Sequence, residues 1–321
     1  MNTPITLGTS ETIVLHDGKD RDAWINARDA GVGASEVPIL LDCGYSESSK
    51  LDLYARKIGT EGLKPFDETE SIQWGRLLED PIITELAKRA ELDPEEWGKN
   101  RCLLGNPAFP YLIATPDGLT SDMEPIEVKA IGHMPHREEW EDGNIPRKYL
   151  IQHQCQMAVC GAKRGLFGAL LFGSKLVWDW FERDDKLIAE IRTKVIDFWG
   201  LVESRTPPES NGSDTAHDAA FALAATIPPK ELFIGEISEH LERWETFASE
   251  EKRLNKAVKE AKASRKSIED ALTLKMGSAK VAITNTGWSF EKTESFRAGY
   301  SVKPSSSKKL EITPPKGTVL I

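Results

Sequence analysis

The chain has 321 residues, enough for one large domain or for one domain with an appendage. Hydrophobic residues make up 40% and charged residues 29%, so the chain can bury a substantial core and has an ordinary composition for a soluble protein. The net charge of -10 argues against a protein that coats nucleic acid indiscriminately, but it leaves room for a local basic channel. No apolar run approaches the ~20 residues of a membrane span, and no secretory signal is visible, so we expect a cytoplasmic protein without membrane contact.

The four cysteines predict neither a disulfide framework nor a zinc site. They form no C-x-x-C pair and have no histidine at zinc-ligand spacing. We expect buried, reduced thiols at Cys43, Cys102, Cys155 and Cys160.

The first 23 residues predict a short lead-in, and 24–208 is dense in periodic apolar residues. Early in that segment, Arg28 precedes a glycine-containing turn, Gly31-Val-Gly-Ala-Ser-Glu36, that runs into an apolar helix. Ser35 is the expected N-cap of this helix, and the free N–H groups of a helix start bind phosphate. Simple capping is the alternative interpretation. The dinucleotide fingerprint is excluded, because the third glycine and a preceding apolar strand are missing.

Residues 75–89 show helical apolar spacing and carry a carboxylate, Glu79, among leucines and isoleucines. A carboxylate beside apolar neighbours has a raised pKa unless a cation compensates it. Glu79 is therefore a candidate metal ligand. The alternative is that Glu79 or Asp80 complements the positive end of the helix.

A turn carrying Asp117 is followed by a short predicted strand, Ile126-Glu-Val-Lys-Ala130. Side chains alternate along a strand, so Glu127 and Lys129 point the same way, roughly 6 to 7 Å apart. Two carboxylates and an ammonium group in this arrangement form a site for a hard divalent cation such as Mg²⁺. The alternative is an ordinary half-buried strand whose polar face pairs glutamate with lysine.

The remaining pattern predicts a mixed α/β (α+β) fold in which helices flank a central sheet. A helix over 148–159 carries Gln152 and other amides, strands at 165–173 and 176–181 form a pair, and 184–202 is an amphipathic helix. The segment 209–231 is predicted as a linker, because proline and glycine punctuate it.

The C-terminal part, 232–321, has a different pattern. A long helix or helical pair is predicted over 232–276, with many basic residues between 252 and 266. The interpretations are a solvated coiled-coil face or an arm that approaches DNA or forms oligomers. Asn285-Thr-Gly287 then predicts a β-hairpin, and the tail from Ser305 is expected to be loosely ordered.

In this order, the motifs resemble the lambda exonuclease/YqaJ-like viral recombinase family of PD-(D/E)XK nucleases. They are the G-x-G-A-S-E turn, W-G-x-x-x-E ending at Glu79, T-P-D-G, E-V-K and Y-x-x-Q-x-Q. The resemblance implies that Mg²⁺ is bound by Glu79, Asp117, Glu127 and the main chain of Val128. It also implies that Lys129 addresses the attacking water, that Gln152 lies near the active centre, and that Arg28 and Ser35 hold a DNA 5′-phosphate.

The family implies a restriction-endonuclease-like core with two Mg²⁺ ions, replaceable by Mn²⁺. The expected activity is 5′-to-3′ digestion of double-stranded DNA ends in a bacterial cytoplasm, yielding 3′ single strands for recombination. The family also implies a phage single-strand annealing protein as partner and a trimeric ring. The tail beyond Pro208 departs from the compact members. The alternatives are a structure-specific endonuclease or repair nuclease with the same core, and a DNA-end-binding module without catalysis. A structural coiled-coil protein would explain only 232–276.

Overall fold

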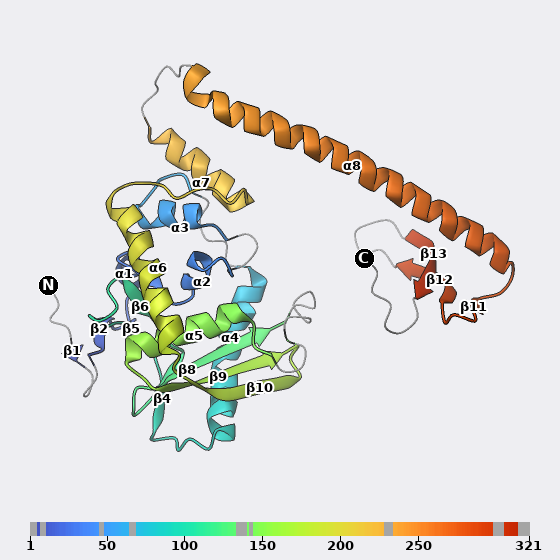
Figure 1. Ribbon diagram of the computed structural model, residues 1–321. Helices are drawn as coiled ribbons and strands as arrows, with labels where there is room; N and C mark the ends of the chain where they lie inside the picture. The colour runs from blue at the N-terminus through green and yellow to red at the C-terminus, as the bar shows by residue number, and fades with distance from the viewer. Residues whose placement is uncertain are drawn as a thin grey trace. The chain divides into compact units, whose positions relative to one another are not determined.

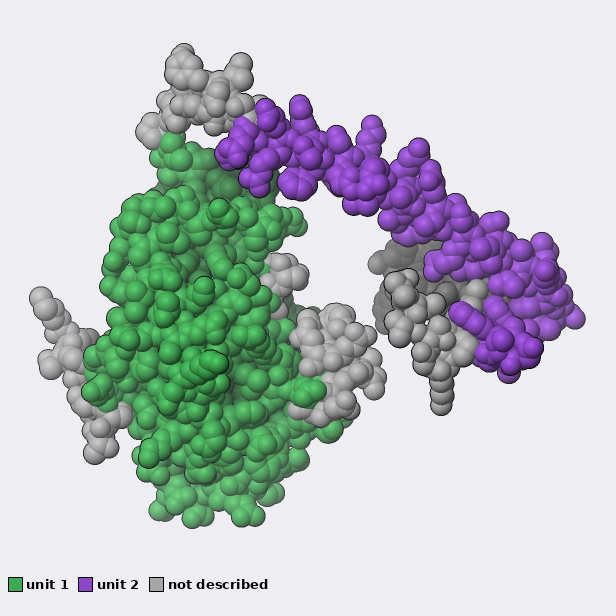
Figure 2. Space-filling model, in the orientation of Figure 1, with its two compact units in different colours: residues 1–228 green, residues 229–321 purple. Residues whose placement is uncertain are grey.

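The computed structural model describes residues 5–6, 11–44, 48–63, 69–132, 140, 144–227, 234–297 and 305–313. The chain divides into two compact units, Met1–Pro228 and Pro229–Ile321 (Figure 2). No helix within the described ranges is both long and apolar enough to cross a membrane.

The first unit contains two five-stranded mixed sheets where the sequence predicted one central sheet (Figure 1). In sheet order, the first consists of β1 (Ile5–Thr6), β2 (Ile13–His16), β5 (Leu103–Gly105), β6 (Leu112–Ala114) and β3 (Val32–Gly33). The second consists of β10 (Lys175–Glu182), β9 (Arg164–Leu171), β8 (Pro125–Ile131), β7 (Gly118–Thr120) and β4 (Trp97–Lys99). Among the described strands, only β3–β6 and β8–β9 pair in parallel. The predicted mixed α/β class is confirmed.

Helices cover both faces of the second sheet. Helix α4 (Glu70–Arg89) packs Ile83 and Leu86 against Ile126 and Val128 of β8. Helix α5 (Arg147–Cys160) is the crossover between parallel strands β8 and β9, and it contacts both. Glycine at 168 on β9 permits the approach of α4, because a Cβ there would lie 2.7 Å from a methyl of Leu86.

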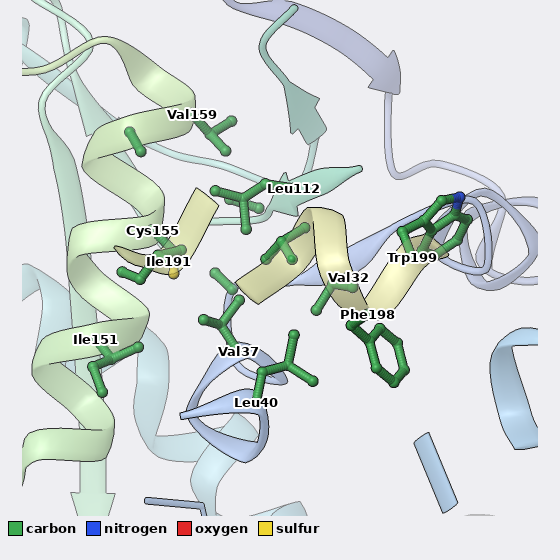
Figure 3. Packing of buried hydrophobic residues seen from close by; sticks show 14 of the residues in the cluster. Val32, Val37, Leu40, Leu112, Ile151, Cys155, Val159, Ile191, Phe198 and Trp199 are labelled. Atoms are coloured by element: carbon green, nitrogen blue, oxygen red, sulfur yellow. The ribbon is translucent and has the colours of Figure 1, made fainter. Parts of the chain in front are cut away.

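The larger hydrophobic core lies between α5, α6 (Asp185–Glu203), α2 (Val37–Leu40), α3 (Lys50–Lys57) and the first sheet (Figure 3). Helix α6 buries Ile188, Ile191, Val195, Phe198 and Val202, a three-and-four spacing that turns one helix face inward. This confirms the amphipathic helix predicted over 184–202.

Two cysteines of the core, Cys155 and Cys160, are buried, and burial raises the pKa of both thiols. Cys43 and Cys102 are only partly buried, and all four are free thiols. The expectation of reduced cysteines is met, but full burial holds for two of them.

Several boundaries differ from the sequence prediction. Helix α4 begins at Glu70, where the Thr69 side chain caps it, and not at Gly75. Pro81 lies inside this helix. The lead-in supplies β1, β2 and part of α1 (Arg21–Arg28). The predicted linker contains α7 (Asp214–Ala225), whose buried alanines let it pack against α3.

In its described residues, the second unit contains one helix and one sheet. Helix α8 (Ile234–Met276) is a single continuous helix of 43 residues (Figure 1). The predicted hairpin is present as β11 (Val281–Ile283) and β12 (Ser289–Arg297), joined by a turn in which Gly287 has φ +87°. The tail is not loosely ordered at 305–313, because β13 (Ser305–Thr313) pairs antiparallel with β12. Pro314 and Pro315 lie outside the described residues.

Candidate active site

Strand β8 carries the centre of the candidate site. Its alternation places Glu127 and Lys129 on one face, and Lys129 Nζ forms an ion pair with Glu127 Oε1. The Glu127 side chain is only 2% exposed, whereas Lys129 keeps 24% of its side chain exposed. On the opposite face of β8, Ile126 and Val128 pack against α4. This packing holds the strand, and with it the polar pair, in place.

Asp117 reaches β8 from the bend that joins β6 to β7. Strand β7 pairs with β8 directly after this bend, and the Val128 N–H donates to Asp117 Oδ2 at 2.8 Å. Asn100 secures the bend, since its side-chain amide donates to Pro116 O and its N–H donates to Asp117 O. Asp117 therefore lies beside the main chain of Val128, the position expected for a shared metal site.

Glu79 faces this group from α4. It lies in the middle of the 20-residue helix, which excludes the alternative that it complements the helix N-terminus. Burial, followed by the charges of Glu127 and Asp80, raises the pKa of the Glu79 carboxyl. Its helix neighbour Leu77, expected on the apolar face, is 66% exposed.

The three carboxylates interact electrostatically. Burial is the main reason that the pKa of Asp117 stands well above its ordinary value of 3.8; Glu127 and Glu79 raise it further, and Lys129 opposes them. A bound cation would relieve the repulsion among clustered carboxylates and the raised pKa values of Asp117 and Glu79.

Two glutamines of α5 hold Glu127 from the other side. Gln152 Nε2 donates to Glu127 Oε1 and Gln156 Nε2 donates to Oε2, each at 2.5 Å. Gln152 was predicted near the centre, but Gln156 was not singled out. Its signal in the sequence is its position one helical turn after Gln152, on the same face of α5.

His153 fixes the orientation of Gln156. An ionised carboxylate only accepts, so Gln156 turns its NH₂ group to Glu127 and its Oε1 to His153 Nδ1, 3.1 Å away. The imidazole must then carry its proton on Nδ1. Burial lowers the pKa of His153 and keeps the ring neutral. Gly165 makes room, because a Cβ there would lie 2.5 Å from His153 Nε2.

The donor set fits a hard divalent cation, but it is not assembled as a finished coordination shell. Within the described ranges, no group of three or more His, Cys, Asp or Glu side chains is placed to hold a metal ion. Both oxygens of Glu127 face N–H donors. Glu79 has no ion-pair partner in the described part of the chain. Metal binding would thus require Glu127 Oε1 to exchange a nitrogen donor for the ion, while Asp117 and Glu79 supply further oxygens.

The residues expected at the DNA terminus line a pocket of ≈180 Å³ next to this centre. Arg28 and Ser35 are both in its wall. The full lining is Trp24, Arg28, Gly33, Ala34, Ser35, Leu103, Ile113, Ala114, Thr115, Gln152 and Gln156. Because Gln152 and Gln156 also hold Glu127, this pocket (the terminus pocket) and the carboxylate group share a wall.

Ser35 does not cap α2. The N-cap position belongs to Glu36, whose side chain makes no capping bond to α2, and the helix is only four residues long. The expectation that Ser35 is the N-cap is therefore wrong, whereas its contact with a DNA phosphate stays a prediction. Ser35 is exposed in the turn before α2 and lines the pocket.

Arg28 is held by a partly buried ionic group. Glu36 Oε1 lies 3.6 Å from Arg28 Nη2, and Glu36 Oε2 accepts from Gly33 N–H and pairs with Lys57 Nζ at 3.0 Å. Lys57, with a side chain 3% exposed, also donates to Arg28 O. The Arg28 guanidinium lies 5.0 Å from the Trp24 ring centroid.

Thr115 adds an unpaired group to the terminus pocket. Its Oγ1 is buried and has no hydrogen-bond partner in the described residues, although the residue lines the pocket. A buried hydroxyl without a partner is costly, so a ligand atom in the pocket would satisfy it. In the sequence, Thr115 stands out only as part of the turn that carries Asp117, so it was not predicted as a site residue.

A second hollow of ≈180 Å³ continues from the first at Ser35 and Gln152. Its polar wall includes Lys129, Lys148 and Tyr149. The ammonium groups of Lys129 and Lys148 lie 5.8 and 5.4 Å from the Tyr149 ring centroid. Two cations and an aromatic ring beside the carboxylates form a surface suited to a nucleotide.

Comparison with known proteins gives a consistent family. Residues 23–163 match the model of the YqaJ-like viral recombinase domain. The uncharacterized protein YqaJ of Bacillus subtilis is 27% identical over 217 residues, covering 67% of this chain and 66% of that protein.

Solved structures of exonucleases are also similar. The alkaline exonuclease LHK-Exo of Laribacter hongkongensis matches with a TM-score of 0.48 and 27% identity over 58% of this chain and 94% of that one. A phage-related exonuclease of Haemophilus somnus matches with a TM-score of 0.43 and 15% identity over 54% and 94%.

The matched segment contains Arg28, Ser35, Glu79, Asp117, Glu127, Val128, Lys129 and Gln152. Residues 23–163 of this chain are therefore similar to the YqaJ-like viral recombinase domain.

Proposed function

We propose that this protein is a Mg²⁺-dependent DNA exonuclease that digests double-stranded ends from 5′ to 3′ and leaves 3′ single strands for recombination. One observation carries the proposal. The pocket containing Arg28 and Ser35 shares Gln152 and Gln156 with the carboxylate group, so a terminal phosphate in the pocket would place the adjoining phosphodiester close to Asp117 and Glu127.

Asp117, Glu127, Glu79 and the main chain of Val128 would hold Mg²⁺ (or Mn²⁺), with two ions as the family resemblance implies. Bound ions supply an acidified water and neutralise charge that develops on phosphorus. The chain's own residues do the rest. Arg28 binds the terminal phosphate, and the neutral amides of Gln152 and Gln156 hold the Glu127 carboxylate in one orientation.

Lys129 would act on the proton of the attacking water. Its ammonium is anchored on Glu127 and reaches the second hollow, where the water and the scissile phosphate would meet. An ammonium group there can donate to a phosphate oxygen, and its neutral amine can accept a proton. The fixed position of Lys129 on a rigid strand suits a group that must act at one atom.

The product of this reaction suggests the wider role. A 3′ single strand would be taken up by a single-strand annealing protein, which we propose as the partner. Ring assembly of three nuclease units is a further expectation from the resemblance.

A plasmid assay tests the proposal. Linear and covalently closed forms of one plasmid are incubated with the protein and Mg²⁺, with EDTA as control. We expect mononucleotide release from the linear form and no change in the closed form. Cleavage of the closed circle would support the alternative, a structure-specific endonuclease. Binding of linear ends without cleavage in Mg²⁺ or Mn²⁺ would support a silent end-binding module.

A further inference from the structure

Helix α8 exposes an apolar stripe that the nuclease proposal does not use. Large side chains stand in solvent along it: Trp244, Phe247, Leu254, Val258 and Ile268 are 49–68% exposed. With about 1.5 Å per residue, the 43-residue helix is about 65 Å long. Exposed apolar patches of this kind mark interaction surfaces.

The stripe follows a heptad repeat, with positions three and four residues apart. Its members are Trp244, Phe247, Glu251, Leu254, Val258, Ala261, Arg265, Ile268 and Leu272. Seven of these nine are apolar, which is the pattern of a coiled-coil seam. The basic residues of the same segment, such as Lys252, Lys256 and Lys259, fall outside the seam on the outer face.

The two charged residues of the seam select the orientation of a partner helix. A parallel in-register pair would bring Glu251 against Glu251 and Arg265 against Arg265 inside the seam. Like charges at that place are strongly unfavourable. An antiparallel pair centred between Lys259 and Glu260 instead brings Glu251 of one helix within one turn of Arg265 of the other.

The same antiparallel alignment matches the apolar residues. Phe247 meets Leu272, Val258 meets Ala261, and each charged residue is flanked by apolar layers. In the single chain, Arg265 Nε lies 3.7 Å from Glu269 Oε1. The Arg265 side chain of this ion pair is exposed, and exposed ion pairs contribute little to stability. The Glu269 contact therefore does not prevent Arg265 from pairing with Glu251 of a second helix.

We propose that α8 pairs antiparallel with α8 of a second copy of this chain, with Glu251 of each helix beside Arg265 of the other. In the antiparallel orientation, the apolar and charged positions of the seam match those of an identical helix. For this reason we choose a second copy of the chain over another partner. The pairing is independent of the nuclease proposal.

Engineered disulfides in the full-length protein test the orientation. In the antiparallel pair, position 257 of one helix lies next to position 264 of the other, beside the seam. The Ala257→Cys/Ser264→Cys variant should therefore form a covalent dimer under mild oxidation. Ile268→Cys alone should not, because the two copies of residue 268 are about 25 Å apart in this alignment. Ser249→Cys, on the outer face, is the matched control, and the wild type reports on the native cysteines. Cross-linking of Ile268→Cys and not of the 257/264 variant would show a parallel pair and overturn the proposal.

Sedimentation of point variants tests the seam itself. Val258→Glu should raise the dissociation constant at least roughly tenfold, whereas Ala263→Glu, with the same new charge on the outer face, should not change it. Glu251→Arg should weaken the pair, and Glu251→Arg/Arg265→Glu should restore it. Circular dichroism checks that helix content is kept. Identical masses for wild type and Val258→Glu over a concentration series would overturn the proposal. Loss of DNA binding in Lys256→Glu, with no self-association in the wild type, would instead assign α8 to DNA.

Discussion

Gln156 Nε2 lies 2.5 Å from Glu127 Oε2, and this hydrogen bond joins helix α5 to strand β8 at the most buried carboxylate of the site. Because Gln156 occupies Oε2, the other oxygen, Oε1, faces Lys129 and Gln152, which line the second hollow. If the proposed cation binds here, the glutamine would leave Oε1 as the oxygen of Glu127 that faces it.

Replacing Gln156 by leucine should damage both stability and activity. The buried Glu127 Oε2 would lose its donor, at a cost of about 1–3 kcal/mol or more for a charged group. Denaturant unfolding measures the first effect, and the Mg²⁺ concentration for half-maximal cleavage should rise. Gln154→Leu is the matched control, since Gln154 bonds Glu182 O and Asp184 N–H away from Glu127. It should cost stability but leave the Mg²⁺ requirement unchanged. Equal Mg²⁺ requirements in both variants would contradict the assignment.

Lys129→Ala should abolish cleavage while DNA-end binding survives. A single charged group acting on the reacting atoms is commonly worth about 3 kcal/mol or more, so kcat should fall at least roughly a hundredfold. Lys148→Ala gives the comparison, because Lys148 lines the same hollow without contacting Glu127. It should raise KM with little change in kcat. Comparable turnover by Lys129→Ala and wild type would remove the catalytic assignment.

The raised pKa of Asp117 predicts a pH effect on the metal-free protein. Burial makes the folded state hold this proton more tightly than the unfolded chain. Protonated Asp117 thus contributes fully to the folding stability at pH values below 3.8, the ordinary pKa of aspartate. This contribution is lost as the pH rises through the raised pKa of the folded state. In EDTA at pH 8, Asp117→Asn should therefore melt a few degrees above wild type, at roughly 2–4 °C per kcal/mol.

Adding Mg²⁺ should reverse that order. The wild type gains stability from the ion, whereas Asp117→Asn, which has lost an anionic ligand, should gain almost none. Melting curves with and without Mg²⁺ at several pH values make the comparison. An unchanged Mg²⁺ response in the variant would place Asp117 outside the metal site.

The sequence predicted the polar face of β8 because strand alternation is strictly local. Glu127 and Lys129 needed only a period of two, and the structure has them on one face. Gln156, and His153 behind it, could not be predicted in the same way, because the contact of Gln156 with Glu127 depends on how α5 packs across the sheet.

Local signals also misled at helix boundaries. Ser35 has the chemistry of an N-cap, but the side chain of Glu36 is drawn back to Gly33, Arg28 and Lys57, and the helix starts one residue later. The alanines of α7 look like a linker until α3 supplies a surface for them. Tertiary contacts decided both cases.

Arg28 should create a preference for 5′-phosphorylated ends. A guanidinium–phosphate contact is charge-assisted, worth about 1.5–3 kcal/mol, or roughly 10- to 100-fold in rate at limiting substrate. Arg28→Ala should remove most of the difference between 5′-phosphate and 5′-hydroxyl duplexes and leave the Mg²⁺ requirement intact. Paired rate measurements on the two duplexes check this. A variant that keeps the full preference would show that the pocket does not hold the phosphate.

The polarity of digestion is the most direct test of the proposed 5′-to-3′ exonuclease activity. A linear duplex carrying one label on the 5′-terminal nucleotide and another on the 3′-terminal nucleotide of the same strand is digested in Mg²⁺, with Asp117→Asn as the inactive control. We expect the wild type to release the 5′ label first, as a mononucleotide, and Asp117→Asn to release neither label. Release of the 3′ label first, or of both labels on internal fragments, would contradict it.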